Sequence, residues 1–174
     1  AILYNQNNVW QVHRDNRWRC PAGTTVYVDG ALGSDANDGM AVGTGALATP
    51  QAAMDLVKAN FDLALIGSSP VVIQLADGTY TSAGTVVKVN GTFFGYQPTT
   101  ATFPSANEVP VVVRGNVSTP ANVILHSTSG VIGTFLSILG PTVAVEGVKI
   151  TSASGYGLRV AYGTVIFGNV IFGE

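Results

Sequence analysis

Carboxylate side chains gather in one short stretch, residues 29–39, which contains Asp29, Asp35 and Asp38 together with one Asn and three Gly. Oxygen ligands at this density are of the kind that binds Ca²⁺. The spacing is not that of an EF-hand loop, however, because no bidentate Glu stands at the twelfth position. A loop folded by Asx turns, with Gly at positive φ, explains the same residues. We therefore expect no metal site, and Asp29, Asp35 and Asp38 are weak calcium candidates only.

Ionisable residues are sparse in the second half of the chain. Cleavage of a sugar chain requires a pair of carboxylates, or a metal ion with a base. Every Asp lies at or before Asp77, and no catalytic residue is predicted in residues 1–174. Whether the protein is an enzyme stays open. The ionisable side chains after residue 108 are Arg114, His126, Glu146, Lys149, Arg159 and Glu174.

Simple structural explanations account for most of these side chains. Glu146 and Lys149 are close in the sequence, so we expect a surface ion pair between them. His126 follows a predicted strand and is expected to face outward or to be hydrogen-bonded. Ser127 and Ser129 lie beside it, but no Asp is placed to orient the imidazole. A nucleophilic triad is therefore not supported.

The composition indicates an all-β protein. Charged residues make up 10% of the chain and hydrophobic residues 47%, and the formal net charge is −2. The usual charged fraction is roughly 25%. This balance excludes a disordered tail, a coiled coil and a nucleic-acid-binding protein with a basic surface. The 21 Gly and 8 Pro are typical of short strands joined by tight turns.

Cysteine content and apolar runs exclude further classes. Cys20 is the only cysteine, which rules out an internal disulfide and a cysteine zinc site, and we expect a buried thiol. No glycine-rich stretch follows the pattern of a phosphate-binding loop, so no cofactor is expected. Apolar runs such as residues 131–140 are short and interrupted, so membrane insertion is not expected either.

The first 23 residues differ from the rest of the chain. They contain both Trp and three of the five Arg. Trp and Arg dominate the hot spots of protein interfaces. Residues 1–23 are therefore predicted to be an attachment or docking segment, with Trp10, Arg14, Arg17 and Trp18 at the interface. The alternative is a short element that packs on its own domain.

Residues 24–69 are predicted to hold an opening strand at 24–28, the acidic glycine loop, and one α-helix at 49–61. Thr49 is a suitable N-cap, and Pro50 fits the first helical turn. A single amphipathic helix can cover the open end of a stack of strands, whose unpaired backbone groups otherwise invite aggregation. Near-helical spacing relates the apolar residues Ala52, Ala53, Leu56, Val57 and Phe61.

A repeat of 22 residues marks the end of the chain. Residues 142–150 (TVAVEGVKI) align without a gap with residues 164–172 (TVIFGNVIF), and a turn former, Gly147 or Asn169, holds the same position in both. Each copy reads as a short strand, a bend and a second short strand with alternating side chains. A unit of this length accommodates one turn of a β-solenoid.

A second similarity has an offset of 25 residues, between STSG at 127–130 and SASG at 152–155. It fits a turn of the same solenoid that carries a small insertion. Residues 70–174 are therefore predicted to be the first coils of a β-helix. Because no capping element follows the last strand, we expect the coils to continue beyond the chain.

The aligned repeat also predicts which side chains face outward. Val143 and Val145 share the inward phase, as Val165 and Phe167 do in the second copy. Outward positions of the second copy hold Ile166 and Ile171, where the first has Ala144 and Lys149. Such an apolar stripe suggests burial against another subunit. Ile166 and Ile171 are therefore predicted interface residues of a homotrimer, and cover by a loop or by further coils is the alternative.

The order of motifs over residues 24–80 resembles the pectate-lyase-like right-handed β-helix family, as found in bacteriophage tailspike and tail-fibre proteins. The resemblance implies an all-β fold, a right-handed parallel β-helix with an N-terminal capping α-helix. Pro50 departs from the pattern, which usually has an aliphatic residue there. Because this fold hosts lyases, hydrolases and non-catalytic spikes, it does not define an activity. The motifs are VYVD at 26–29, GSDANDG at 33–39, ATPQAAMD at 48–55 and VVIQLADGTY at 71–80.

From this resemblance we expect the N-terminal part of a tailspike or tail fibre, a structural and host-recognition component of a phage-type particle that presents a glycan-binding region. Residues 1–23 would bind a particle or baseplate protein, and a homotrimer would contact cell-surface polysaccharide. The expected location is the virion tail, or the extracellular or cell surface, with no nucleic-acid partner. One alternative is a polysaccharide depolymerase, that is, a polysaccharide lyase or glycoside hydrolase whose active coils lie beyond Glu174. The other alternative is a bacterial surface adhesin.

Overall fold

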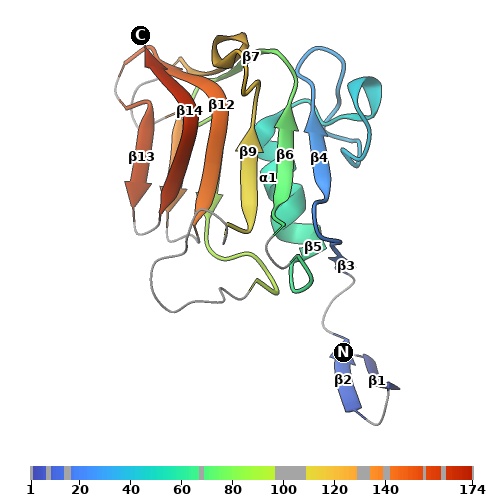
Figure 1. The fold of residues 1–174 in the computed structure, drawn as a ribbon. Helices are drawn as coiled ribbons and strands as arrows, with labels where there is room; N and C mark the ends of the chain where they lie inside the picture. Colours follow the sequence, from blue (N-terminus) through green and yellow to red (C-terminus); the bar gives the residue numbers. More distant parts are fainter. Residues whose placement is uncertain are drawn as a thin grey trace.

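A computed structural model of the chain describes residues 2–6, 9–13, 17–66, 69–96, 109–128, 134–138, 142–154, 156–161 and 164–173, with residues 2–6, 9–13 and 136–138 described by their backbone alone. Strands dominate these residues, and a single α-helix, α1 (Pro50–Asn60), accompanies them (Figure 1). The prediction of a mostly β fold with one helix is confirmed. No helix in the described ranges is long and apolar enough to span a membrane.

The largest sheet has seven strands, and every pair in it is parallel. Its order is β4-β6-β9-β12-β10-β7, and β14 pairs with β12 outside this path. The strands are β4 (Thr25–Val28), β6 (Val71–Leu75), β7 (Gly78–Ser82), β9 (Val111–Arg114), β10 (Val123–Ser127), β12 (Val143–Ser152) and β14 (Val165–Gly173).

Strand β12 joins two rows of strands, because its two halves have different neighbours. Its first half, up to Glu146, pairs with β9, and its second half, from Lys149, pairs with β10. Strand β14 pairs with β12 along both halves. The first row therefore contains β4, β6, β9 and the first halves of β12 and β14. The second row contains β7, β10 and the second halves.

A third row is a separate parallel sheet with the order β13-β11-β8. Its strands are β8 (Val87–Asn90), β11 (Phe135–Ile138) and β13 (Leu158–Ala161). From β6 onward the chain visits the three rows in the same sequence, first β6-β7-β8, then β9-β10-β11, then β12 followed by β13. Each return to a row places the new strand beside its predecessor in that row (Figure 1).

The register of the last strands agrees with the repeats in the sequence. Val143 pairs with Val165 and Ile150 with Phe172, which is the predicted offset of 22 residues. Ser127 pairs with Ser152, which is the offset of 25. Both alignments are therefore confirmed as parallel pairings between neighbouring strands.

The bends inside β12 and β14 occur at the predicted turn formers. Gly147 has a φ of 65° and Asn169 a φ of 50°, and Asn169 is the one non-glycine residue with positive φ among those described. Asn adopts this left-handed region more readily than other residues with a Cβ. Here the chain passes from the first row to the second without a loop.

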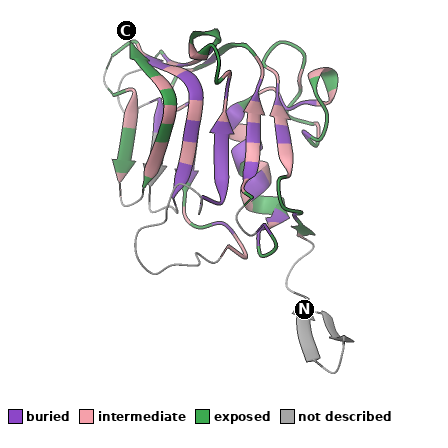
Figure 2. Ribbon diagram, in the orientation of Figure 1, coloured by how far each residue is buried: buried purple, intermediate pink, exposed green. Residues whose placement is uncertain are grey.

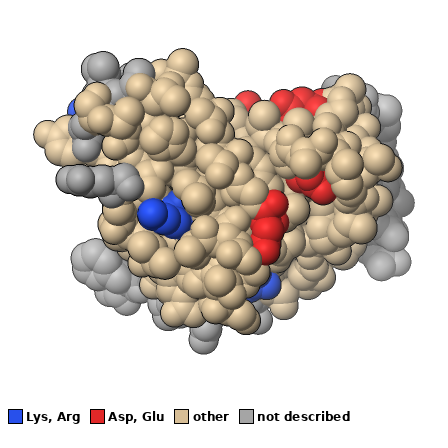
Figure 3. Space-filling view, turned by 90° about the horizontal axis from the view of Figure 1, so that it is seen from above, with Lys and Arg blue, Asp and Glu red and all other residues tan. Residues whose placement is uncertain are grey.

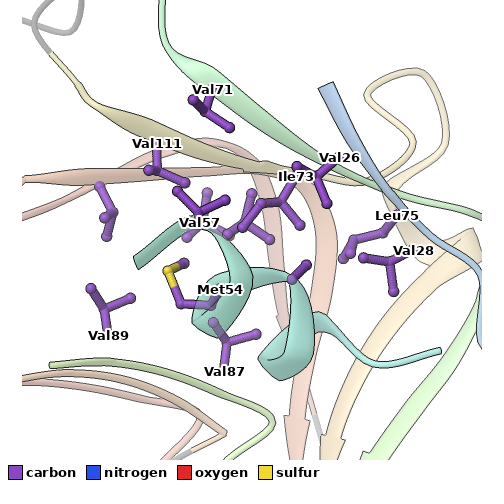
Figure 4. Close-up of a cluster of buried hydrophobic side chains, with 14 of the residues drawn as sticks. Val26, Val28, Met54, Val57, Val71, Ile73, Leu75, Val87, Val89 and Val111 are labelled. Atoms are coloured by element: carbon purple, nitrogen blue, oxygen red, sulfur yellow. The ribbon is translucent and has the colours of Figure 1, made fainter. Parts of the chain in front are cut away.

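Inward side chains from the three rows form the core (Figure 2). Burial alternates along β6, β10 and the first half of β12, as expected for strands with one face against a core. Helix α1 lies against the same core, and Figure 4 shows Met54 and Val57 among valines of the first and third rows. The predicted helix therefore covers the inward side chains of the first strands.

The buried face of α1 differs in part from the prediction. Thr49 is the N-cap, and its hydroxyl accepts a hydrogen bond from the Ala52 N–H at 3.2 Å. Met54 and Val57 are fully buried, whereas Leu56 is half-buried. Phe61 follows the helix as its C-cap, in strand β5 (Phe61–Asp62).

Two smaller sheets complete the described residues. Strands β1 (Ile2–Gln6) and β2 (Val9–His13) form an antiparallel hairpin. Strand β3 (Trp18–Arg19) pairs in parallel with β5. Short 3₁₀ helices are η1 (Gly43–Gly45) in the acidic loop and η2 (Pro120–Asn122) before β10.

The end of the predicted docking segment packs on its own domain. The Trp18 ring meets Phe61 edge to face at 5.1 Å, although Trp18 stays 46% exposed. The Arg17 guanidinium lies 4.5 Å from the centre of the Phe94 ring. The side chain of Trp10 and all of Arg14 lie outside the described residues, so their role at an interface remains a prediction.

Strand β14 forms the exposed end of the first two rows, because it pairs on one side only. Val165 and Val170 pack against the core as expected from their inward phase. Phe167 and Phe172 share that phase but are 39% and 54% exposed, since no other described strand pairs with β14 on its far side. Their rings contact each other edge to face at 5.6 Å.

Candidate binding groove

A groove of about 410 Å³ lies where β4, β6 and β9 end and the acidic loop crosses them. Its polar wall consists of Tyr27, Asp29, Gln74, Asp77 and Asn116, and its apolar wall includes Val42 and Val117. We refer to it as the β4–β9 groove. Figure 3 looks onto the upper end of the molecule of Figure 1, where acidic side chains lie in patches to the right of the view.

A ladder of outward side chains runs along the first row beside this groove. Tyr27, Gln74, Arg114 and Glu146 are neighbours in register on β4, β6, β9 and β12. Residues in register on adjacent parallel strands project side by side from the same face. The first row thus presents an aromatic ring, an amide and an ion pair in that order.

Gln74 is held in place by its amide nitrogen. Nε2 lies 3.2 Å from the carbonyl oxygens of Leu75, Arg114 and Gly115. These contacts tie β6 to the turn after β9. The amide oxygen receives no hydrogen bond from the described residues, so Gln74 offers the groove a fixed acceptor.

Asp77 is held by two amides on the other side of the groove. Asn116 Nδ2 donates to Oδ1 at 3.1 Å, and Asn122 Nδ2 donates to Oδ2 at 2.9 Å. Asn116 Oδ1 in turn accepts from the Thr119 N–H at 2.9 Å. The turn after β6 and the segment before β10 are thereby joined through one carboxylate.

The three calcium candidates serve separate turns. Asp29 Oδ1 accepts from the N–H groups of Ala31 and Leu32 at 2.9 and 3.0 Å, an Asx turn that leaves Oδ2 without a donor from the described residues. Asp38 Oδ1 accepts from the Met40 N–H at 3.0 Å. Within the described ranges, no group of three or more His, Cys, Asp or Glu side chains is placed to hold a metal ion.

Asp35 connects the acidic loop to the start of α1. Its Oδ1 accepts from the N–H groups of Ala48 and Thr49 at 2.9 and 2.8 Å, and its Oδ2 accepts from the Thr49 hydroxyl at 2.9 Å. A carboxylate beside a helix N-terminus is favourably placed with respect to the helix dipole. Part of the acidic sequence is therefore explained by the need to fix α1.

The expected ion pair between Glu146 and Lys149 is wrong. Glu146 forms its ion pair with Arg114, the residue opposite it in register on β9. The bend at Gly147 separates Glu146 from Lys149 and places them in different rows. Spacing along the sequence was therefore a poor guide to the partner, whereas the cross-strand register identifies it.

The candidate nucleophile and base residues have structural partners. His126 Nδ1 lies 2.8 Å from the Thr151 hydroxyl oxygen, which confirms the expectation of a hydrogen-bonded histidine. Ser127 is fully buried, and Ser129 lies outside the described residues. Cys20 is buried as predicted, and burial raises the pKa of its thiol.

The remaining interface candidates lie on the edge strand. Ile166 is half-buried and Ile171 is 40% exposed, both on the exposed edge strand β14.

The β4–β9 groove was not predicted as a site from the sequence. Only the acidic composition of residues 29–39 pointed to this end of the molecule, because the polar wall comes from three separate strand ends.

Comparisons of the chain with family models, characterised proteins and solved structures found no match.

Proposed function

We propose that the chain forms the first coils of a right-handed parallel β-helix that serves as a structural and recognition component, in the manner of a phage tailspike or tail fibre. The observation that carries the proposal is the order in which the chain visits the three rows of parallel strands. Crossovers between parallel strands are right-handed in nearly all proteins, which favours that hand here. The motif order over residues 24–80 supports the same fold.

The placement of ionisable side chains favours a scaffold over a catalyst for this part of the protein. Arg114 and Glu146 neutralise each other, His126 is hydrogen-bonded to Thr151, and Asp77 holds two amides. Catalytic carboxylates work as a pair that brackets the scissile bond. Among the described coils Glu146 has a cation, and no second acid, as its partner.

The proposal includes a homotrimer located on a virion tail or on an extracellular or cell surface. Ile166 and Ile171 on β14 would be buried where three β-helices lie side by side. Mass photometry or light scattering on the parent protein measures the assembly directly. We expect a trimer that Ile166→Lys combined with Ile171→Lys dissociates, whereas a monomer at micromolar concentration would overturn this part of the proposal.

Glycan binding and glycan cleavage by the parent protein separate the proposed function from its main alternative. The parent protein would be incubated with capsular and acidic polysaccharides, and bound and released sugars would be measured. We expect the parent protein to retain polysaccharide. In the same assay, residues 1–174 alone should release no oligosaccharides. Release by these residues alone would identify a depolymerase and overturn the proposal.

A further inference from the structure

We propose that the β4–β9 groove binds an uncharged hexose unit of a glycan and rejects acidic sugars. The inference rests on the proposed function, and adds to it a location and a ligand class. The volume of about 410 Å³ is enough for one or two sugar rings. The inference that the ligand is an uncharged hexose follows from three properties of the groove, namely its free acceptors, its apolar wall and its charge.

Hydrogen-bond acceptors that no described residue uses point to a ligand that donates. Asp29 Oδ2 and the Gln74 amide oxygen receive no donor from the described residues, while the other polar atoms of both side chains are already held. The Tyr27 hydroxyl, which can both donate and accept, is similarly free among these residues. Sugar hydroxyl groups match such a set, because each of them donates one hydrogen bond.

The apolar wall fits the other face of a sugar ring. Val42 is 70% exposed and Val117 is 42% exposed, although both line the groove. The outward phase of β4 places the Tyr27 ring beside them. Aliphatic and aromatic surface lined with a few fixed polar groups is the usual composition of a small-molecule site. A hexose presents C–H groups on one face and hydroxyls at its edge, so it fits both walls together.

The charge of the groove excludes acidic ligands. Asp29 and Asp77 contribute two carboxylates, and none of the described residues that line the groove is Lys, Arg or His. The nearest cation along the ladder, Arg114, is paired with Glu146. A uronate or a sugar phosphate would meet uncompensated like charge, which disfavours binding. An uncharged hexose avoids this repulsion.

The test compares two sugars that differ in charge. Methyl galactoside and galacturonic acid, and then neutral and acidic oligosaccharides, would be titrated into the chain and followed by NMR shifts of residues that line the groove. We expect shifts with the neutral probes and none with the acidic ones. Tyr27→Ala should weaken neutral binding by about tenfold, from loss of the ring surface.

Charge variants separate the groove from the rest of the acidic loop. Asp29→Asn keeps an acceptor for the Asx turn but removes the charge and the free carboxylate oxygen, so neutral binding should weaken and acidic sugars should gain affinity. Asp38→Asn is the matched control, because this carboxylate serves the same loop but does not line the groove. It should leave both affinities unchanged, and melting temperatures would confirm that all variants are folded.

Three outcomes would overturn the inference. They are preferential binding of galacturonic acid, neutral binding that Tyr27→Ala and Asp29→Asn leave unchanged, and the absence of shifts with every neutral probe. In the second case a glycan still binds elsewhere, so the proposed recognition function survives. The proposed function would fail together with this inference only if, besides one of these outcomes, the parent protein retained no polysaccharide.

Discussion

The side-chain amide of Gln51 pairs with the backbone of Lys88 as a neighbouring strand would. Gln51 Oε1 accepts from the Lys88 N–H at 2.6 Å, and Nε2 lies 3.4 Å from the Lys88 carbonyl oxygen. Strand β8 is at the end of its sheet, so this edge has no strand partner among the described residues. Lys58, two turns further along α1, donates to the Asn90 carbonyl oxygen. Helix α1 thus covers the edge of β8 by satisfying backbone groups as well as by packing on the core.

Replacing Gln51 with Ala should destabilise the fold by about 1–2 kcal/mol, because two backbone groups at the edge of β8 lose their partners. Gln51→Glu keeps the acceptor for the Lys88 N–H and should cost less. Urea unfolding measures both effects, and amide exchange at Lys88 should accelerate in the Ala variant only. Equal stability of Gln51→Ala and the unsubstituted chain would show that water hydrogen-bonds the backbone groups of this edge as well as Gln51 does.

The packing of α1 predicts a difference between two substitutions to Asp. Met54→Asp places a charge at a fully buried position and should cost about 3–5 kcal/mol. Leu56→Asp affects a half-buried side chain and should cost about 1–2 kcal/mol, because its carboxylate can reach water. Thermal unfolding of the two variants provides the comparison. The reverse order would mean that the helix presents a different face to the core.

The bends of β12 and β14 predict that Ala substitutions at Gly147 and Asn169 will reduce the stability of the fold by different amounts. A Cβ on Gly147 would lie 2.7 Å from the Val117 amide nitrogen at a φ of +65°, so Gly147→Ala meets both a backbone clash and an unfavourable conformation. We expect a loss of about 2–4 kcal/mol for Gly147→Ala and about 1 kcal/mol for Asn169→Ala. Gly84→Ala is the control, since nothing lies within 4 Å of its Cβ and its φ is not positive. A measured effect of Gly147→Ala as small as that of Gly84→Ala would contradict the bend geometry.

Burial of Tyr80 predicts a loss of stability in alkali. Desolvation raises the pKa of Tyr80 from 10.0 to about 12, and its hydroxyl donates to the carbonyl oxygen of Ala76 at 2.9 Å. Between these two pH values the unfolded chain releases the phenolic proton while the folded chain retains it. The unfolding free energy should therefore fall by roughly 2 kcal/mol as pH rises through this window.

Tyr80→Phe should be less stable than the unsubstituted chain near neutral pH, because it lacks the hydroxyl contact. The variant should also lack the part of the alkaline fall in unfolding free energy that Tyr80 causes. The difference in unfolding free energy between the two chains should therefore narrow as pH rises. Urea unfolding at a series of pH values measures this difference. Parallel pH profiles would show that Tyr80 ionises in the folded chain as readily as in the unfolded one.

Local pattern was enough to predict the repeating part of the fold. The alignment of residues 142–150 with 164–172 predicted the pairing of Val143 with Val165 and the bends at Gly147 and Asn169. Parallel strands stacked in register repeat the same inward and outward positions, so the stacking leaves a period in the sequence. Thr49 and Pro50 similarly marked the start of α1, because helix caps are made from neighbouring residues.

Tertiary structure decided the partners of the polar side chains. Glu146 pairs with Arg114 instead of Lys149, Asp35 holds Thr49, and Gln51 covers Lys88. Each of these partners is separated from its residue by several intervening elements or by a loop, and the lengths of those segments follow no period in the sequence. The β4–β9 groove has the same origin, because Tyr27, Gln74 and Asn116 meet only after β4, β6 and β9 have paired side by side. A repeating pattern determines which face a side chain occupies, but the residue that it contacts depends on the length of chain between successive strands.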